Sequence, residues 1–494
     1  MPSVKPSAKR QFLLILSLLL TLASCKSKAP NSEDSAQRPG QTSSLPKTAQ
    51  ASKDAPNIIL VVLDTVRRDH LSTYGYERST SPTLTRLAGR GVRFSRCTSV
   101  APWTHPAHAS MLTGTYPSTH GARYCGIPKN QQEAILALSS RIPLLQLILA
   151  SAGYHTVASV GAPVLSPGLG VTRGFAHFFG SFPDAEPTAS EVNSRLFKGL
   201  DRRSGQGPVF ALVNYYDAHG PYTARPRYAP WIDTPKMVRQ VDLASSIKGV
   251  PRFARLAAGL DTLSVDDRRA AVDNYDSEIA RMDHALGELV TGLEKRGLLE
   301  NSLVAITSDH GEYFGEHGLF DHGRTLFRQM LDVPLVVFGR AVQKGKTVDE
   351  PVQTLDLFTT FLEAAGLAVP PTNRGTSLGP LLTGKGNHVR HPIVAEAFAD
   401  PAVTEMAPVY AADYKALQRG DKKLISRGTQ DAELFDLATD PEENHDLSGA
   451  KKDLKNELES VLRAWLPSVS ASESAPASLS PEEKNRLKAL GYLK

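Results

Sequence analysis

The sequence predicts an α/β fold with a mostly parallel central sheet and a small C-terminal subdomain of strands and helices. Two observations lead to this prediction. Short apolar runs rich in Ile and Val recur along the chain, and amphipathic helical patterns separate them. After about residue 395 this alternation gives way to short strand-like segments joined by polar turns. With 494 residues, the chain is long enough for one large domain or two unequal ones.

The first 25 residues resemble an export signal and are not expected to belong to the fold. A positive start with Lys5, Lys9 and Arg10 precedes the apolar run FLLILSLLLTLA, which is too short to span a bilayer comfortably. Cys25 follows Leu-Ala-Ser, as in the bacterial lipobox, where a cysteine becomes lipid-modified after cleavage. An ordinary signal peptide with an incidental cysteine is the alternative.

A lipid on Cys25 would tether the mature chain to a membrane. Lys26 rather than Asp follows the cysteine, which by resemblance to lipoprotein sorting favours the outer membrane and periplasm of a Gram-negative host. Residues 26–55 are rich in Ser, Lys, Gln, Pro and Ala and lack apolar periodicity, so they are predicted to form a flexible tether.

Five apolar runs are predicted to be strands buried on both faces. They cover residues 57–64, 154–160, 208–217, 302–311 and 333–339. The clearest helix lies within 277–297, where apolar residues recur every three or four positions and Gly297 is the predicted stop. Because strands alternate with helices, we expect a largely parallel sheet in a main catalytic domain over residues 56–395.

The C-terminal subdomain is predicted to be a small sheet with helices over residues 396–467. Within it, residues 412–426 are typical of two short strands around a Gly-Asp turn. A Ser-rich linker and a short terminal helix are predicted for residues 468–494.

Charge and cysteine content restrict the class of protein. The net charge of +5 is spread along the chain without a long basic run, which argues against nucleic acid as the main partner. Cys97 and Cys125 either form a disulfide, which export would permit, or remain two buried thiols. Neither has the spacing of a structural zinc site.

Acidic and imidazole side chains follow three of the predicted strands. Asp64 ends the first strand, Asp217 and His219 follow the strand from 208, and Asp309 and His310 follow the strand from 302. Because ligands bind beyond the carboxyl ends of strands in open α/β sheets, we expect these residues to lie together. Asp64, Asp309 and His310 are the predicted primary ligands of one divalent metal. Carboxylates suit Mg²⁺, Ca²⁺ or Mn²⁺, and the histidine admits Mn²⁺ or Zn²⁺.

A threonine in the stretch APWTHPAHASMLTG, residues 101–114, is a candidate nucleophile. Pro106 suits the first turn of a helix that continues to Gly114, so Thr104 stands at the helix entrance, where free backbone N–H groups attract phosphate-like anions. His108 lies one turn further on and is predicted to reach back towards Thr104. Simple helix capping by Thr104 is the alternative.

A second group of polar side chains consists of Asp217, His219 and His322. We expect it to donate a proton to the leaving group or to anchor the oxygens of that group. A second metal, giving a two-metal site, is the alternative. Glu312 lies in the same loop as His322 and is a candidate neighbour of the metal ligands.

Five segments, in chain order, carry the most specific motifs. They are NIILVVLDTVRRDHLSTYGY, TSPTLTRLAGRGVRFSRCTSVAPWTHPAHASMLTGTYPSTHG, DAHGPY, LVAITSDHGEYFGEHGLFDHGRTLFRQMLDVPLVV and ELFDLATDPEENHDLS. Together they resemble the sulfatase family of the alkaline phosphatase superfamily, from about Asn57 to Leu447. The resemblance implies an alkaline-phosphatase-like α/β sandwich with a smaller C-terminal subdomain, and a metal-dependent hydrolase of phosphoric or sulfuric esters.

The resemblance also assigns expected roles to single residues. The three predicted ligands match metal-ligand positions of the family. Thr104 falls where the family carries its nucleophile, which also contacts the metal. His219 and His322 fall near positions that contact the transferred group or the leaving group.

This sequence departs from the family pattern in two places. Typical members have a Cys or Ser, converted to formylglycine, in a Cys/Ser-x-Pro-x-Arg motif, whereas this chain has Thr104 and replaces the arginine with His108. Thr65 stands where many members have a second acidic ligand. Threonine nucleophiles occur in related branches, such as nucleotide phosphodiesterases and lipoteichoic acid synthases. The pattern therefore resembles a sulfatase-fold enzyme that uses a plain threonine alkoxide.

These observations predict hydrolysis of phosphate diesters or phosphonate esters through Thr104. A formylglycine hydrate expels sulfate by collapsing to the aldehyde, but a threonine sulfate ester lacks that exit. The alternatives are a sulfuric ester hydrolase without formylglycine, a transferase of phospho-groups in the cell envelope, and an inactive binding lipoprotein. Because of the predicted membrane tether, an envelope glycan or lipid is the expected source of the ester.

Overall fold

The computed structural model describes residues 50–52, 54–124, 135–180, 186–205, 207–232, 246–247, 250–389, 391–399, 407–428, 431–465, 475–489 and 493. The predicted export signal, Cys25 and nearly all of the predicted tether lie outside the described residues. Cys125 also lies outside them, and Cys97 is a buried free thiol. No helix in the described part of the chain combines the length and apolar character needed to cross a bilayer.

A large mixed sheet forms the centre of the main domain, and its strand order is β14-β2-β13-β10-β1-β7-β5-β6, with β15 also paired to β2. The strands are β1 (Asn57–Leu63), β2 (Gly91–Thr98), β5 (His155–Val160), β6 (His177–Phe179), β7 (Val209–Tyr215), β10 (Ser302–Thr307), β13 (Asp332–Gly339), β14 (Lys346–Val348) and β15 (Val352–Gln353). All five predicted strands are present. β1, β5, β6, β7 and β10 run parallel, as predicted, whereas β13 runs antiparallel to both of its neighbours.

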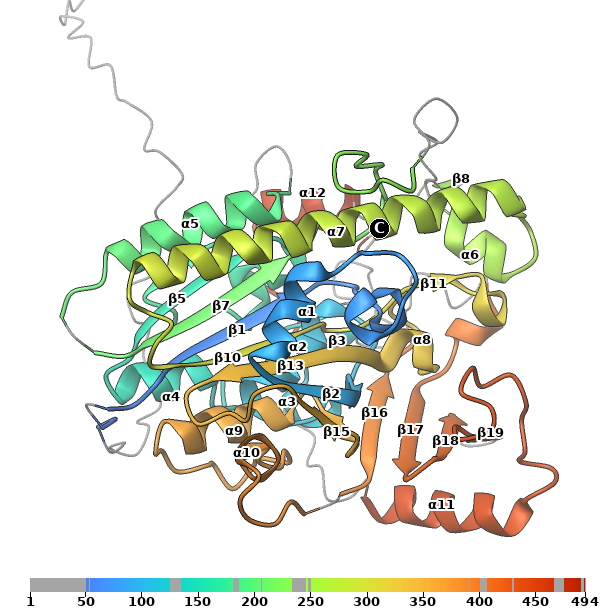
Figure 1. Cartoon of the computed structure of the whole chain (residues 1–494). Helices are drawn as coiled ribbons and strands as arrows, with labels where there is room; N and C mark the ends of the chain where they lie inside the picture. Colours follow the sequence, from blue (N-terminus) through green and yellow to red (C-terminus); the bar gives the residue numbers. More distant parts are fainter. Residues whose placement is uncertain are drawn as a thin grey trace, which may run out of the picture.

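The side chains of β1 alternate between two apolar cores, one on each face of the sheet. Ile58, Leu60 and Val62 belong to one core, and Ile59 and Val61 belong to the other. Helices cover both faces, which explains why the strand is apolar along its whole length. The fold is therefore the predicted sandwich of helices around a buried sheet (Figure 1).

The helices of the two faces differ in length. Helices α5 (Ala189–Asp201) and α7 (Val265–Lys295) lie side by side over one face, with α1 (Pro82–Gly89) against α7 (Figure 1). The other core includes residues of α2 (Thr104–Thr113), α4 (Leu145–Ser151) and α9 (Asp356–Ala364). The helix predicted within 277–297 is the C-terminal half of α7, and the stop at Gly297, with φ +63°, is confirmed.

A four-stranded antiparallel sheet forms the C-terminal subdomain, in the order β16-β17-β18-β19. Its strands are β16 (Ile393–Ala397), β17 (Tyr414–Arg419), β18 (Lys422–Arg427) and β19 (Asp431–Asp436), and α11 (Lys452–Trp465) packs against it (Figure 1). The predicted hairpin turn is present, with Gly420 at φ +63°. β16 begins slightly before the predicted boundary at 396. The terminal helix α12 (Pro481–Ala489) returns to the main domain, where Leu487 is buried in the core.

Short elements complete the described part of the chain. They are α3 (Pro117–His120), α6 (Arg252–Ala257), α8 (Arg328–Leu331), α10 (Gly379–Thr383), β3 (Arg123–Tyr124), β4 (Ile135–Leu136), β8 (Ser246–Ile247), β9 (Val250–Pro251), β11 (Tyr313–Phe314) and β12 (Phe320–Asp321). The hairpin of β11 and β12 matters most for function, because it extends the loop that follows β10.

Candidate active site

The three predicted ligands converge at the carboxyl ends of β1 and β10. Asp64 directly follows β1, and Asp309 and His310 follow β10, which pairs with β1 in parallel. All three side chains are buried, and one ligand atom from each lies within 4.8 Å of the others. Nδ1 of His310 donates to the carbonyl of Gly311 over 2.9 Å, which leaves the lone pair of Nε2 for a metal.

Amide donors of the fold occupy one oxygen of each carboxylate, and the other oxygen of Asp64, Oδ1, lies 3.5 Å from the hydroxyl of Thr104. Oδ1 of Asp309 accepts the backbone N–H groups of Thr65 and His310, over 3.2 and 3.0 Å, whereas Oδ2 is buried and has no hydrogen-bond partner among the described residues. Oδ2 of Asp64 accepts the side-chain amide of Asn214 over 3.0 Å. An unpartnered buried carboxylate oxygen is costly unless a cation neutralises it. The donor set of Asp64, Asp309 and His310 therefore fits a divalent metal.

The electrostatics of the two acids agree with this reading. Burial raises the pKa of Asp64 well above its usual value, and the charge of Asp309 raises it further. Burial also raises the pKa of Asp309. Burial lowers the pKa of His310 well below its usual value, so this imidazole is neutral and supplies no positive charge to the pair. A bound cation would offset both the cost of burying the two carboxylates and the repulsion between their charges.

Thr104 is the first residue of α2, and its hydroxyl joins the ligand cluster. Oγ1 of Thr104 lies 3.2 Å from Nε2 of His310 and 3.5 Å from Oδ1 of Asp64. The N-cap position belongs to Trp103, and no side chain caps the helix. Thr104 is therefore not the helix cap, and the capping alternative is wrong. The predicted helix end is confirmed, since Gly114 adopts φ +65°.

His108 reaches back towards Thr104, as predicted, but it contacts the backbone. Nδ1 of His108 donates to the carbonyl of Thr104 over 2.9 Å and lies 3.6 Å from Oδ2 of Asp309. Burial lowers the pKa of this histidine, so the ring is neutral, and Nε2 has no partner among the described residues. His108 thus supports the first turn of α2 beside the metal ligands.

His219 and His322 lie together at the edge of this cluster. Their ring centroids are 4.8 Å apart, and His322 is 4.6 Å from the ring of His310. Burial lowers the pKa of His219 to about 3, with a contribution from the charge of His322. Of the second predicted group, these two histidines are therefore brought to the site.

His322 forms an ion cluster with Glu312 and Asp321. Its Nδ1 lies 3.2 Å from a carboxylate oxygen of each acid. Burial alone would lower the pKa of His322, but the two carboxylates outweigh it and raise the pKa well above its usual value. The three residues also satisfy the distance requirement for a metal site. A protonated imidazole already occupies the position between the two acids.

Asp217, the third member of the second predicted group, lies outside both clusters. Its buried carboxylate pairs with Arg281 of α7 over 2.8 Å and accepts the backbone N–H of Ala189 at the start of α5 over 3.2 Å. Asp217 is turned away from the other predicted residues because the guanidinium of Arg281, on a helix far along the chain, pairs with its carboxylate. In the structure Asp217 links α5 to α7 and is not placed to bind a metal with His322.

Thr65 does not offer its side chain to the metal ligands. Its backbone is left-handed, with φ +59°, a rare conformation for a β-branched residue. In this conformation the N–H of Thr65 points at Asp309, and its carbonyl accepts the hydroxyl of Tyr275 over 2.7 Å. Strained backbone of this kind occurs preferentially at functional sites.

Sequence reasoning missed Asn214 and Asp321. Asn214 lies inside β7, and the search for strand-end acids and histidines passed over it as part of an apolar run. Asp321 directly precedes His322, and the DH pair was the available signal. Their roles became visible only from the hydrogen bond to Asp64 and from the ion cluster with Glu312.

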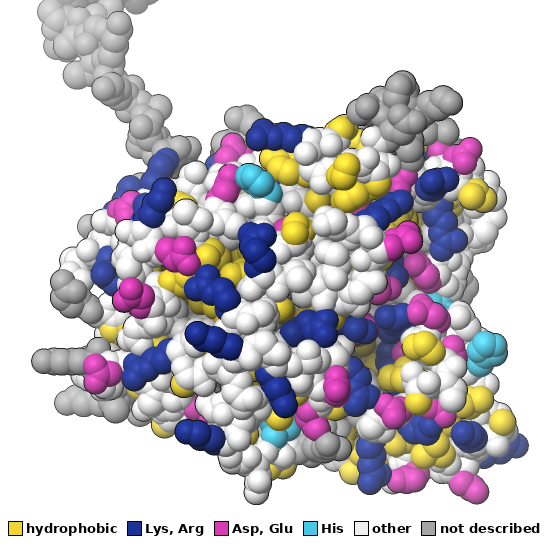
Figure 2. Space-filling view, in the orientation of Figure 1, with side chains coloured by type: hydrophobic (Ala, Val, Ile, Leu, Met, Phe, Trp, Pro, Cys, Tyr) yellow, Lys and Arg dark blue, Asp and Glu magenta, His cyan; other side chains and the backbone are white. Residues whose placement is uncertain are grey.

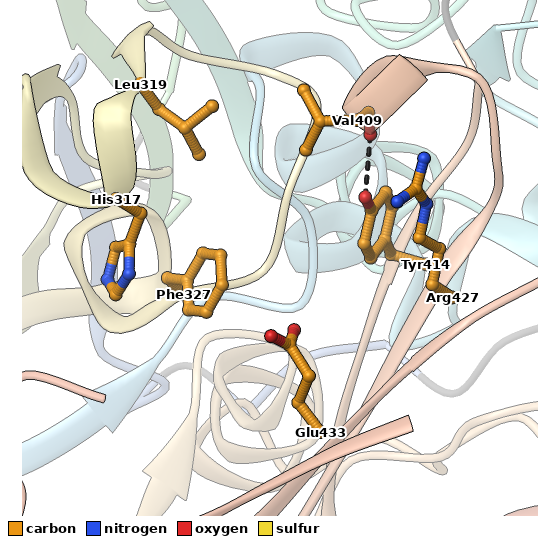
Figure 3. Close-up of a pocket in the computed structure, with 7 residues that line it drawn as sticks. All are labelled: His317, Leu319, Phe327, Val409, Tyr414, Arg427 and Glu433. Atoms are coloured by element: carbon orange, nitrogen blue, oxygen red, sulfur yellow. Dashed lines mark hydrogen bonds between the residues drawn. The ribbon is translucent and has the colours of Figure 1, made fainter. Parts of the chain in front are cut away.

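A separate cavity of about 480 Å³ lies between the loop after β10 and the C-terminal sheet. Its lining residues are His317, Leu319, Phe327, Val409, Tyr414, Arg427 and Glu433 (Figure 3). The rings of His317 and Phe327 stack 3.9 Å apart, and the hydroxyl of Tyr414 donates to the carbonyl of Val409. None of the predicted ligands lines this cavity.

The outer surface carries charges of both signs. Figure 2 shows Lys and Arg side chains scattered among Asp and Glu over the face that it presents.

Comparison with known protein families gives two matches. The family model described as Sulfatase matches residues 56–367, and the model described as N-sulphoglucosamine sulphohydrolase, C-terminal, matches residues 315–468. The first covers the central sheet and both clusters, and the second covers the C-terminal sheet.

Relatives of known activity match along most of the chain at low identity. N-acetylglucosamine-6-O-sulfatase of Bacteroides thetaiotaomicron is 22% identical and covers 82% of this chain and 84% of its own length. Choline-sulfatase of Rhizobium meliloti is 24% identical, with coverages of 78% and 81%. Arylsulfatase K of Xenopus laevis is 31% identical, but over only 40% of this chain and 38% of its own length.

Solved structures share the fold. One, determined in complex with its substrate D-glucosamine-2-N,6-O-disulfate, has a TM-score of 0.69 at 19% identity and covers 86% of this chain and 100% of its own. Phosphonate monoester hydrolase of Silicibacter pomeroyi has a TM-score of 0.67 at 19% identity, with coverages of 84% and 96%. At these identities the likeness shows the fold and leaves the substrate open.

Proposed function

This chain belongs to the sulfatase family of alkaline-phosphatase-like ester hydrolases, and we propose that it cleaves phosphate diesters or phosphonate esters with Thr104 as the nucleophile. The observation that carries the proposal is the position of the threonine hydroxyl. It is buried at the start of α2, within 3.2 Å of His310 Nε2 and 3.5 Å of Asp64 Oδ1. A hydroxyl that only capped the helix would bond to backbone N–H groups of α2. This hydroxyl instead faces the candidate metal ligands, as a nucleophile would.

The ester group would be held between the metal ligands and the first turn of α2. Asp64, Asp309, His310 and Thr104 would hold a divalent cation, which would neutralise the charge of the bound ester and lower the pKa of the threonine hydroxyl. The free backbone N–H groups at the start of α2 favour an anion at the same place. His108 keeps the first turn of this helix in position through its hydrogen bond to the carbonyl of Thr104.

In the first step, Oγ1 of Thr104 loses its proton to solvent and forms a bond to phosphorus while the bond from phosphorus to the leaving oxygen breaks. In this proposal His322, held protonated by Glu312 and Asp321, gives its proton to that oxygen. In the second step, water attacks the phosphorus atom and gives a proton to His322, while the bond from phosphorus to Oγ1 of Thr104 breaks and Oγ1 takes up a proton from solvent. The product is a phosphate monoester from a diester, or a phosphonate from a phosphonate ester. His219 packs against His322 and contributes to the leaving-group side.

The preference for phosphorus rests on the threonine. A threonine sulfate ester cannot collapse to an aldehyde, so its hydrolysis requires attack by water at sulfur. A phosphothreonine breaks down by the same in-line attack that formed it. The second candidate is a sulfuric ester hydrolase that uses Thr104 directly, and the match to sulfatases along most of the chain favours it.

The test is a substrate panel. Purified protein lacking residues 1–25 is assayed with an aryl sulfate, an aryl phosphate monoester, an aryl phosphodiester and an aryl phosphonate ester, each with Mn²⁺, Zn²⁺, Mg²⁺ or Ca²⁺. We expect phosphodiester or phosphonate turnover to exceed sulfate turnover. Faster turnover of the sulfate would reject the preference for phosphorus. Hydrolysis of none of the four, together with no bound metal, would support a binding lipoprotein.

A pair of substitutions tests the nucleophile. Thr104→Ala should abolish both turnover and the covalent intermediate, whereas Thr104→Ser retains a hydroxyl and should keep measurable activity. The intermediate is detected by mass spectrometry after acid quench as a phosphorylated peptide that contains residues 101–114. Unchanged activity in Thr104→Ala would remove this residue from the mechanism.

We propose further that the mature protein is a lipoprotein anchored through Cys25, with its substrate in the cell envelope. The charged start, the short apolar run and the lipobox-like sequence support this proposal. Mass spectrometry of the mature N-terminus from a bacterial host is the test, and Cys25→Ser is the control. An N-terminus that begins elsewhere and carries no lipid would reject it. Transfer of the phospho-group to a glycan hydroxyl instead of water would identify an envelope transferase.

A further inference from the structure

Asn214 has a single possible amide orientation. Its side-chain oxygen accepts the backbone N–H groups of Gly161 and Ala162, over 3.2 and 2.9 Å. Only the carbonyl end of an amide accepts, so the NH₂ group must point the other way. There it donates to Oδ2 of Asp64 over 3.0 Å. The strand β7 thus fixes which oxygen of Asp64 remains available.

Asp309 is restricted in the same way by different donors. Two backbone N–H groups occupy its Oδ1, one of them from the left-handed residue Thr65. Its Oδ2 is buried and unpartnered among the described residues. Each acid therefore has one oxygen that already accepts hydrogen bonds from fixed donors, which disfavours chelation of a cation through both oxygens.

The resulting donor set suits some cations better than others. Asp64, Asp309 and Thr104 each offer one oxygen, and His310 offers one nitrogen. Ca²⁺ prefers six to eight oxygen ligands and commonly uses both oxygens of a carboxylate. Imidazole nitrogen is a good ligand for Mn²⁺ and Zn²⁺, which accept fewer ligands. The restriction of the two carboxylates therefore disfavours Ca²⁺.

We propose that Asn214 is a positioning residue that limits Asp64 to one cation-facing oxygen and thereby makes the site prefer Mn²⁺ over Ca²⁺. This inference rests on the proposed function only in its choice of Asp64, Asp309 and His310 as ligands. Beyond the proposed function, the inference states that Mn²⁺ is the preferred cation. It also states that Asn214, which is not itself a ligand, determines this preference.

The experiment measures binding without substrate. The full chain is stripped of metal with a chelator and titrated separately with Mn²⁺ and Ca²⁺ by calorimetry, and bound Mn²⁺ is also followed by electron paramagnetic resonance. We expect the native chain to bind Mn²⁺ more tightly. In Asn214→Leu the affinity for Mn²⁺ should fall by about 10- to 100-fold, as for other residues that orient a metal ligand. Ca²⁺ binding should stay the same or tighten, because Oδ2 of Asp64 becomes available.

Asn193→Leu is the matched control. Asn193 is also a buried asparagine, on α5, whose amide donates to the carbonyl of Ala285 over 2.8 Å and accepts the hydroxyl of Tyr215 over 2.6 Å. Its loss should cost similar stability and leave the ratio of the Mn²⁺ and Ca²⁺ affinities unchanged. A second variant, Asn214→Asp, keeps an acceptor for Gly161 and Ala162, so it covers the case in which Asn214→Leu does not fold. It lacks the donor to Asp64, and the affinity ratio should again shift towards Ca²⁺.

Two results would overturn the inference. One is a native chain that binds Ca²⁺ at least as tightly as Mn²⁺. The other is an Asn214 variant that folds and retains the native affinity ratio. A chain that shows the expected ratios but hydrolyses no ester would refute the proposed function and leave the inference standing.

Discussion

Two clusters in this molecule have the same composition and different electrostatics. Asp64, Asp309 and His310 form the first, and Glu312, Asp321 and His322 form the second. Each consists of two carboxylates and one imidazole. In the first, burial keeps the imidazole neutral, and one carboxylate oxygen has no hydrogen-bond partner in the described part of the chain. In the second, the imidazole sits between the acids, and they keep it protonated.

The two clusters show that the types of side chain in a cluster do not decide what neutralises its buried acids. His310 donates its Nδ1–H to a backbone carbonyl, which leaves the lone pair of Nε2 available for a metal. His322 turns Nδ1 to its acids and acts as their counter-ion. We therefore expect the first cluster to require an external cation and the second to function without one.

The largest expected effect comes from removing a charge of the first cluster. Asp64→Asn should lower kcat/KM by at least about 10³-fold, since it removes a metal ligand that also faces the nucleophile. Metal binding, measured by calorimetry, should be lost in parallel. Glu312→Gln serves as the matched change in the second cluster and should retain metal binding. If Glu312→Gln lost the metal as completely as Asp64→Asn, the two clusters would not differ as proposed.

The next effect separates proton donation from metal binding. His322→Gln should reduce kcat by about 10²- to 10³-fold for esters with a poor leaving group and much less for a nitrophenyl ester, which departs without a proton. Its metal affinity should equal that of the native chain. The measurement is a series of aryl esters whose phenols differ in pKa. An equal loss for every leaving group would argue against a proton donor.

Metal removal should destabilise the native fold through the first cluster alone. At a metal concentration 100 times the dissociation constant, binding contributes about 2.7 kcal/mol to the free energy of unfolding. Chelation should therefore lower the Tm of the native chain and of Glu312→Gln by similar amounts. Asp309→Asn should show no such change. A Tm of Asp309→Asn that still responded to the chelator would place the stabilising metal elsewhere.

The last expected effect concerns a third way of neutralising a buried acid. Asp356 accepts backbone N–H groups from Gln353 and Thr376 and has neither a metal nor a histidine partner among the described residues. Burial raises its pKa from 3.8 to about 7. The folded state then holds a proton that the unfolded state releases, so stability falls as pH rises from about 4 to about 7.

The contribution of Asp356 to the pH dependence of stability can be measured by comparing the native chain with Asp356→Asn. Over that interval the native chain should lose up to a few kcal/mol of unfolding free energy relative to Asp356→Asn, whose side chain does not titrate. Denaturant unfolding at a series of pH values measures it. A constant difference between the two proteins across the interval would show that Asp356 is ionised throughout.

Much of the fold was predictable because it depends on local patterns. The five buried strands, the helix stop at Gly297 and the hairpin turn at Gly420 all follow from apolar periodicity and from glycine at left-handed positions. The antiparallel direction of β13 was not predictable in this way. An apolar run buried on both faces has the same sequence pattern in either direction.

The convergence of the candidate metal ligands was predictable for a topological reason. Parallel strands place their carboxyl ends at one edge, so acids and histidines that follow such strands are brought together. Asp217 follows the same rule in sequence, yet its carboxylate pairs with Arg281. The rule identifies candidate ligands. Whether a candidate remains available for a metal depends on whether a positively charged side chain from another element pairs with it.

The sequence by itself determined five buried strands of the sheet, the helix that begins at Thr104 and the residues from which a candidate metal site is built. Only the tertiary structure decided how those residues are used. Asn214 selects the free oxygen of Asp64, the backbone of Thr65 selects that of Asp309, and Glu312 with Asp321 makes His322 a cation. The physical reason is that a carboxylate or an imidazole takes its role from the donors and charges within hydrogen-bond reach, and these come from segments up to about 250 residues away along the chain.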